Sequence, residues 1–214
     1  MRMKFLSSHL SRFDKDYLTI RVKLFTNQPV SLMECVLLKG DASDRKYYRV
    51  RYQLNSSSPA RPLSSIIMQL AKIETKPDFN AMQKFLKDQG IPVPDIFGFD
   101  AERGLIFLMD CGDTHLADQI KTDPKNTVNW DKKAINIIVD FHTRTTEKMT
   151  ADCPAKELFF DTEKLIWEMN FMLEHYVKGM LGNILNPDEK NKTQQALGIV
   201  CQTLSDQDLS LIHI

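Results

Sequence analysis

The sequence lacks the long apolar runs that a membrane-spanning helix requires. Its apolar stretches, such as residues 105–109, extend over a handful of residues, whereas a helix that crosses a bilayer takes about 20. The first residues are charged and contain no apolar run of signal-peptide length, and Arg12 and Asp14 follow at once. We therefore expect a cytoplasmic protein with no membrane partner.

Cysteine is also scarce, and its positions exclude two common uses. Cys35, Cys111, Cys153 and Cys201 form no C-x-x-C pair and have no histidine nearby at the spacing of metal ligands. Such scattered cysteines favour buried free thiols over a zinc site or a disulfide framework. The sequence therefore indicates no metal ligands.

Net charge is absent as well, because 28 Lys and Arg balance 28 Asp and Glu. Hydrophobic residues make up 43% of the chain, which is enough for a sizeable core and excludes global disorder. Basic residues are in excess over residues 1–51, but they are scattered, which favours a solvated face over a nucleic-acid patch. We expect no nucleic-acid partner, and a local anion site stays open.

Local patterns predict a sheet followed by helices. Runs of β-forming residues and an amphipathic pattern before Gly90 predict the order β-β-β-α-β-β over residues 31–38, 46–53, 65–71, 78–89, 95–99 and 105–109. Helices are predicted from residue 114 and over 129–147, 161–178 and 187–203. The chain thus reads as a small sheet lobe, residues 1–110, and a helical lobe, residues 111–214.

The segment from residue 38 to 50, LKGDASDRKYYRV, carries the most chemistry. A turn through Gly40, Ala42 and Ser43 exposes backbone N–H groups and adds a hydroxyl, with Arg45 and Lys46 nearby. Such a turn can hold phosphate oxygens. Taken alone, the same residues also fit a plain hairpin turn, because the segment has a single glycine and no G-x-G-x-x-G pattern.

The larger context resembles one branch of the protein-kinase-like phosphotransferases. This branch is the aminoglycoside and choline phosphotransferase-like kinases, and the likeness is greatest to the bacterial kinases that phosphorylate N-acetylmuramate and N-acetylglucosamine at the anomeric position. Four sequence segments, in the same order as in that family, carry the resemblance: GDASDRKYYR at 40–49, GIPVPD at 90–95, GLIFLMDCGDT at 104–114 and LIWEM at 165–169. The resemblance implies an α+β, protein-kinase-like fold with a small antiparallel N-lobe and a helical C-lobe.

The resemblance also implies how ATP would be held. Gly40, Asp41, Ala42 and Ser43 would cover the phosphates, and Arg45 would add positive charge. Met68 stands where many kinases have a phosphate-binding lysine, and that lysine is missing here. The helix at 78–89 has no glutamate in its middle to act as the partner of such a lysine, and Gln83 is the nearest polar residue.

The phrase at 104–114 would form the hinge beside adenine. There, Met109, Asp110 and Cys111 would offer backbone N–H and C=O groups to the base, with Leu108 and Met68 as apolar walls. The alternative is an ordinary buried strand followed by a turn.

In the helical part, Trp167 and Glu168 are the candidate substrate-binding residues. Trp167 would stack on a sugar ring and Glu168 would hold its hydroxyls. The apolar residues around them are also explained by a helix that packs in a core. His142, in an apolar helix, is interpreted as a core histidine.

No catalytic loop occurs in the chain. Phosphoryl transfer in such kinases uses an H-x-D-x-x-x-x-N loop and a later metal-binding Asp, and these 214 residues contain no such loop. We expect a chain cut short before its catalytic residues and its Mg²⁺ ligands, and therefore catalytically silent. The family function would be ATP- and Mg²⁺-dependent phosphorylation of a small-molecule hydroxyl, on an amino sugar of cell-wall recycling.

Two other functions stay open. The chain can be a non-catalytic nucleotide-binding or scaffold module, although its apolar last residues, 209–214, favour the truncated enzyme. A protein Ser/Thr kinase is disfavoured, because the lysine is missing and no activation segment is present.

Overall fold

The computed structural model describes residues 12–40, 43–56, 62–150, 152–158, 160–182 and 184–207. The chain divides into two compact units, residues 1–133 and 134–214. In the described part, no helix is both long enough and apolar enough to cross a membrane. The fold is mixed α/β, with a five-stranded antiparallel sheet in the first unit.

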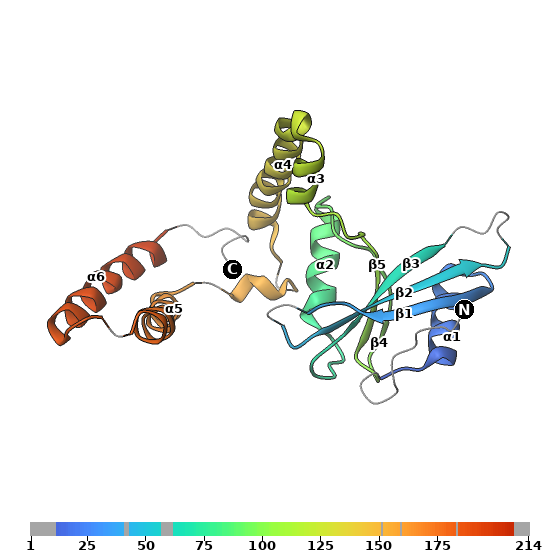
Figure 1. Ribbon diagram of the computed structural model, residues 1–214, viewed down its shortest axis with the longest axis horizontal. Coiled ribbons are helices and arrows are strands. Elements are labelled where there is room, and N and C mark those ends of the chain that lie inside the picture. Colours follow the sequence, from blue (N-terminus) through green and yellow to red (C-terminus); the bar gives the residue numbers. More distant parts are fainter. Residues whose placement is uncertain are drawn as a thin grey trace. The chain divides into compact units, whose positions relative to one another are not determined.

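The sheet has the strand order β1-β2-β3-β5-β4, with every neighbouring pair antiparallel (Figure 1). Its strands are β1 (Val30–Leu37), β2 (Lys46–Leu54), β3 (Leu63–Gln69), β4 (Ile96–Asp100) and β5 (Leu105–Met109). Helix α2 (Asp78–Asp88) lies between β3 and β4 in the chain. The predicted β-β-β-α-β-β order is therefore confirmed, with strand ends within two residues of those predicted.

Both edge strands of the sheet are irregular. The pairing of β1 with β2 shifts in register between Leu32 and Glu34, and the pairing of β4 with β5 shifts between Ile96 and Gly98. Each shift places an extra residue in the edge strand, which bends that strand and increases its twist.

Helix α1 (Lys15–Thr26) precedes the sheet, and the sequence analysis did not predict it. It begins at Asp14, whose carboxylate accepts a hydrogen bond from the Tyr17 N–H at 2.8 Å, and ends at Asn27, which has a left-handed backbone conformation. Leu18 and Val22 are buried one helical turn apart and belong to a core cluster with residues of all strands except β4. This helix therefore covers one face of the sheet.

A second, smaller core cluster lies on the opposite face. It consists of Met68, Leu70, Ile106 and Leu108, with Phe79 of α2 packed against it. Neighbouring residues in a strand point to opposite faces. For this reason Ile67 belongs to the cluster under α1, whereas Met68 belongs to the cluster under α2.

After the sheet the chain is helical, as the sequence predicts. The helices are α3 (Leu116–Thr122), α4 (Thr127–Thr145), α5 (Thr162–Met172) and α6 (Pro187–Ser205), with 3₁₀ turns at Pro124–Asn126, Thr146–Lys148 and Pro154–Glu157. A π-helix, Leu173–Met180, continues α5. Helix α6 begins with a capping box, in which Asn186 and Glu189 each accept a backbone N–H of the other.

All four cysteines are free thiols, as expected from their spacing. Cys35, Cys153 and Cys201 are buried, whereas Cys111 is exposed. The expectation of burial is wrong for Cys111, because the buried strand β5 ends at Met109 and Cys111 lies in the segment that follows it.

Candidate functional site

The predicted phosphate turn lies between β1 and β2, and the structure describes its two sides. Leu38 donates its N–H to the Tyr47 carbonyl at 2.8 Å, which closes the hairpin before the turn. A side chain added at Gly40 would meet no atom within 4 Å, so the backbone there is open to an incoming group. On the other side, the Ser43 hydroxyl accepts the Arg45 N–H at 3.2 Å. Asp41 and Ala42 lie outside the described residues.

Arg45 connects this turn to the first turn of α2. Its guanidinium carbon lies 5.8 Å from the centre of the Phe79 ring, within the range of a cation–π contact. Phe79 in turn packs against the cluster that contains Met68. Phe79 thus contacts both Arg45 and the apolar cluster that contains Met68.

Met68 is fully buried, with 0% of its surface exposed. It pairs with Tyr47 on one side and with Ile106 on the other. Because Met68 is buried, it could contact adenine as an apolar wall only if the side chains that cover it moved. Gln83, the nearest polar residue of α2, points elsewhere, because its side-chain amide donates to the Pro94 carbonyl at 2.8 Å.

The predicted hinge follows β5, and part of its backbone is already used. Met109 donates its N–H to the Asp95 carbonyl at 2.8 Å, so this donor is not free for a base. Cys111 is exposed in the segment that follows. The side chain of Asp110, by contrast, is only 5% exposed and pairs with an arginine of β2.

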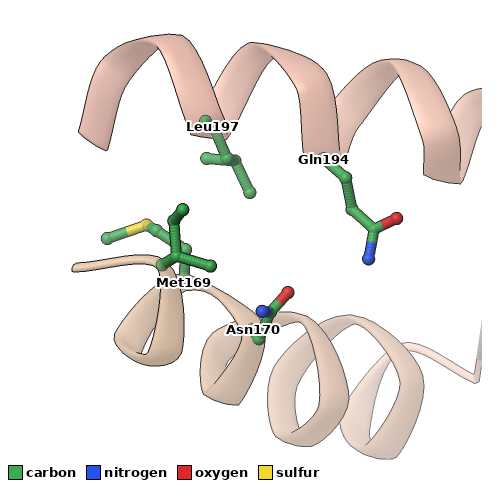
Figure 2. A pocket seen from close by; sticks show the side chains of 6 residues that line it. Met169, Asn170, Gln194 and Leu197 are labelled. Carbon is green, nitrogen blue, oxygen red and sulfur yellow. The ribbon is translucent and has the colours of Figure 1, made fainter. Parts of the chain in front are cut away.

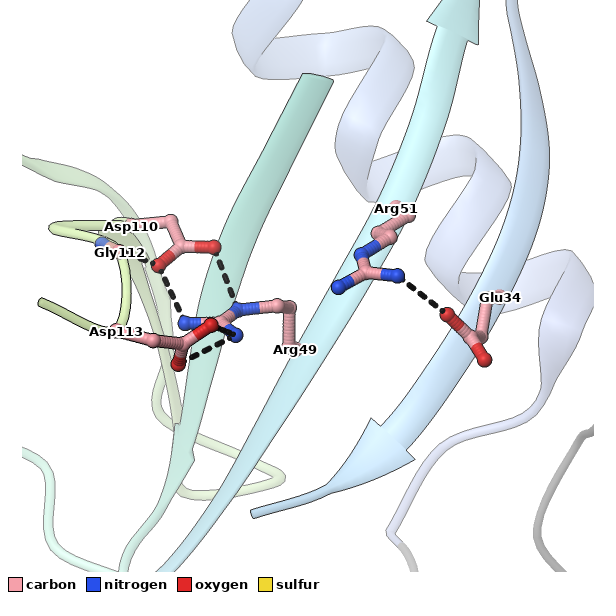
Figure 3. A network of polar contacts seen from close by, with 6 residues as sticks. All are labelled: Glu34, Arg49, Arg51, Asp110, Gly112 and Asp113. Atoms are coloured by element: carbon pink, nitrogen blue, oxygen red, sulfur yellow. Dashed lines mark hydrogen bonds and ion pairs between the residues drawn. The ribbon is translucent and has the colours of Figure 1, made fainter. Parts of the chain in front are cut away.

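That arginine is Arg49, which holds two aspartates after β5 (Figure 3). Its Nη2 donates to Oδ1 of Asp110 at 3.0 Å, and its Nε lies 2.7 Å from Oδ2 of the same carboxylate, without hydrogen-bond geometry. Its Nη1 donates to both carboxylate oxygens of Asp113 at 2.7 Å. The Gly112 N–H donates to Asp110 at 2.9 Å. We call Arg49, Asp110, Gly112 and Asp113, together with Ser64, the linker network.

The contacts of the linker network keep its groups charged. Burial by itself raises the pKa of the Asp110 carboxyl, but hydrogen bonds from Ser64, Arg49 and Gly112 lower it, and the resulting pKa lies below the usual value of an aspartate. Hydrogen bonds to Asp113 and Asp110 raise the pKa of Arg49. The Arg49–Asp110 pair of this network is therefore a buried ion pair that fixes the segment after β5 against β2.

Arg49, Ser64 and Asp113 were not predicted from the sequence as members of a site. Arg49 lies in β2 and Ser64 in β3, so the residues beside them on the next strand depend on the register of the sheet. Asp113 follows the end of β5. Arg49 is paired with Ile66 of β3, and Ile66 with Leu108 of β5, so the side chain of Arg49 lies near the end of β5 only in this register. Strand β2 alternates Tyr and Val with Arg49 and Arg51, so no pattern in the sequence distinguishes the buried Arg49 from the exposed Arg51.

Trp167 and Glu168 lie in α5, in the second unit, where Lys164 brings them together. The Lys164 ammonium lies 4.2 Å from the centre of the Trp167 ring and 3.2 Å from a Glu168 carboxylate oxygen. Trp167 is 55% exposed, so it is not a core residue among the described residues. Phe171 follows it at a ring distance of 5.7 Å.

A pocket of about 160 Å³ lies between α5 and α6. Figure 2 shows Met169 and Asn170 of α5 pointing toward Gln194 and Leu197 of α6 across this space. Trp167 and Glu168 do not line it. The predicted substrate residues therefore sit on a different side of α5 from the hollow that the helix pair encloses.

In comparisons with known proteins, no family model matches the chain, and no curated protein is similar to it.

Proposed function

We propose that the first unit binds an adenine nucleotide, as the N-terminal lobe of a protein-kinase-like phosphotransferase. The observation that carries this proposal is the register of the sheet. Met68 pairs with Tyr47, near the start of the strand that follows the predicted phosphate turn, and with Ile106 of β5, which runs on to the predicted hinge at Met109. Three residues of a strand span about 10 Å, which is the scale of the distance from the base to the phosphates of an extended nucleotide.

Other features of the unit support the same proposal. The strand order with α2 between β3 and β4 agrees with the fold that the sequence resemblance implies. The turn at Gly40 is open, and Arg45 supplies positive charge beside it. The described residues contain no cluster of three or more side chains that could hold a metal ion, so the proposal concerns the nucleotide and not its Mg²⁺.

For the acceptor, we propose a hydroxyl of a small molecule, an amino sugar. The support is the sequence resemblance, together with the exposed ring of Trp167 beside the ion pair of Lys164 and Glu168. An exposed aromatic ring can pack against the C–H face of a sugar, and the charged groups beside it can hydrogen-bond its hydroxyls.

A non-catalytic nucleotide-binding or scaffold module is the second candidate. One observation favours it over a working kinase. Met68 stands at the position where the resemblance places the phosphate-binding lysine.

Nucleotide binding is tested by titrating ATP into the parent chain and into the double variant Gly40→Val, Ser43→Ala. Because a side chain at Gly40 meets no protein atom within 4 Å, the substitution leaves the fold intact and acts only on an approaching ligand. Gly198→Ala, at a second glycine with open space around it, is the matched control. We expect saturable binding by the parent and the control, and at least tenfold weaker binding by the double variant. Equal affinities in all three would contradict the assignment of the phosphate turn.

Transfer is tested separately, with ATP labelled in the γ-phosphate and either N-acetylglucosamine or N-acetylmuramate as acceptor. Label in the sugar would show the phosphotransferase activity. Saturable ATP binding without any labelled sugar would favour the module that binds and does not react.

A further inference from the structure

The first unit has a cavity on the face of the sheet that α1 covers. It is open to solvent on one side, has a volume of about 170 Å³ and is lined by aromatic and aliphatic side chains of α1, β4 and β5. These include Leu24, Phe25, Phe97 and Phe107. An apolar cavity of about 150 Å³ in another protein holds a benzene molecule, so this cavity has the size for one aromatic ring.

The irregular edge strand β4 creates this space. At the register shift, Gly98 pairs with Phe107, and a Cβ at Gly98 would lie 3.9 Å from Cδ2 of that ring, an ordinary contact distance. The absence of a side chain at Gly98 therefore leaves room above the Phe107 ring. Phe97, next to it, stacks on Phe25 of α1 with ring centres 5.1 Å apart, which closes one side.

A single charged side chain, Arg21, lines the cavity. Its Nε donates to the Tyr17 hydroxyl at 3.1 Å, and its Nη2 forms an ion pair with Asp100. Among the described residues, no partner is present for Nη1. Two of the three guanidinium nitrogens thus fix Arg21 in place, and the third keeps its N–H donors for another group.

Asp100 is the charged partner of Arg21, and its two oxygens accept hydrogen bonds from other groups as well. Its Oδ2 accepts the Tyr17 hydroxyl at 2.6 Å, and its Oδ1 accepts the Arg103 N–H at 3.0 Å, so both oxygens have donors besides Arg21. The Arg103 guanidinium lies 4.3 Å from the Tyr17 ring centre, and Arg12 donates to the Arg103 carbonyl at 3.1 Å. The guanidinium groups of Arg21 and Arg103 both lie against the Tyr17 ring, so a second positive charge lies near the Arg21–Asp100 ion pair and favours an anion.

We propose that this cavity binds a small aromatic carboxylate. The ring lies between the phenylalanine side chains and Leu24, and the carboxylate accepts hydrogen bonds from Nη1 of Arg21. Apolar walls with one fixed polar group are the usual build of a small-ligand site, in which the walls supply affinity and the polar group sets orientation. An arginine that is held in position loses little conformational freedom when it binds a carboxylate.

The test uses the full chain labelled with ¹⁵N and phenylacetate as the probe, followed by amide chemical shifts in NMR. We expect saturable shifts confined to residues 20–25, 97–100 and 105–108. Phenylacetamide, which has the ring without the charge, should bind at least tenfold more weakly, since a charge-assisted hydrogen bond is about twice as strong as a neutral one.

Two variants separate the site from an unspecific effect. Gly98→Val fills the cavity while its Cβ keeps an ordinary distance to Phe107, and it should abolish the shifts. Met33→Val, a substitution of an exposed side chain on the opposite edge strand β1, should leave them unchanged. Unchanged binding by Gly98→Val, or shifts at other residues, would overturn the site. Equal affinity for phenylacetate and phenylacetamide would overturn the role of Arg21.

Discussion

The replacement of Asp110 by asparagine should destabilise the first unit by about 3 kcal/mol. The side chains of Asp110 and Arg49 are 5% and 8% exposed, so their ion pair is buried. Removal of one partner of such a pair costs roughly 3–5 kcal/mol, because the other charge stays buried without compensation. We expect the lower end, because Arg49 keeps Asp113 as a partner, and the asparagine oxygen can still accept the Gly112 N–H.

Two further variants separate burial from charge. Asp113 also accepts hydrogen bonds from Arg49, but its side chain is 77% exposed, so Asp113→Asn should cost less than about 1 kcal/mol. The double variant Arg49→Met, Asp110→Leu removes both buried charges together. It should be more stable than Asp110→Asn alone, because apolar residues of similar volume often replace a buried ion pair without loss.

The measurement is native-state hydrogen exchange of the strand amides, read in NMR, for example at Val50 and Phe107. Exchange at these buried positions reports the unfolding free energy of the first unit by itself, whereas a single denaturation midpoint would mix two units that can unfold separately. A loss for Asp113→Asn that equals the loss for Asp110→Asn would refute the reasoning. A double variant less stable than Asp110→Asn would refute it as well.

The same pair has a pH dependence whose sign follows from the lowered pKa of Asp110. The folded pKa lies below the unfolded value of about 3.9. The stabilisation by the carboxylate is therefore complete above about pH 5 and is lost as the pH falls through the folded pKa. The stability difference between the parent and Asp110→Asn should shrink between pH 5 and pH 3. A constant difference over this range would contradict the assignment.

Four smaller predictions concern single residues. Gly104→Ala should cost about 1–2 kcal/mol, because Gly104 has φ +59° and a Cβ would lie 2.7 Å from Nη1 of Arg12. Gly198→Ala, inside α6 with open space around it, should instead stabilise α6 by about 0.5–1 kcal/mol, as measured by hydrogen exchange of the α6 amides. A thiol reagent should label Cys111 at once in the native protein and Cys35 only on unfolding, since burial raises the pKa of Cys35 to about 11; mass spectrometry of the labelled peptides decides this. Burial and the hydrogen bond to Asp100 raise the pKa of Tyr17 to about 12, so its ultraviolet absorbance should titrate above that of an exposed tyrosine.

Most of the fold could be predicted from the sequence because its elements follow simple periodicities. The strands alternate or form short apolar runs, and α2 has a clear apolar face before Gly90. Helix α1 was missed because it is rich in β-branched residues such as Thr19, Ile20 and Val22, which resemble a strand. Its N-cap, Asp14, was the signal that could have shown it.

The candidate site could be predicted only where its residues are contiguous in the chain. The turn at Gly40 and the segment at Met109 are short contiguous segments, and the structure describes all of the second and all of the first except Asp41 and Ala42. The linker network and the cavity beside Arg21 depend on the register of neighbouring strands and on the packing of α1. Such contacts join residues far apart in the sequence, and no single-segment pattern contains them.

The register shifts in β1 and β4 also affect how the molecule behaves at high concentration. An exposed edge strand can pair with the edge of another molecule, which is how sheet proteins begin to aggregate. Here each free edge contains one residue too many for a regular ladder, so a second edge can align with only a few residues on one side of the shift. The register shift in β4 that opens the cavity at Gly98 thus also hinders edge-to-edge pairing of this sheet with another copy of itself.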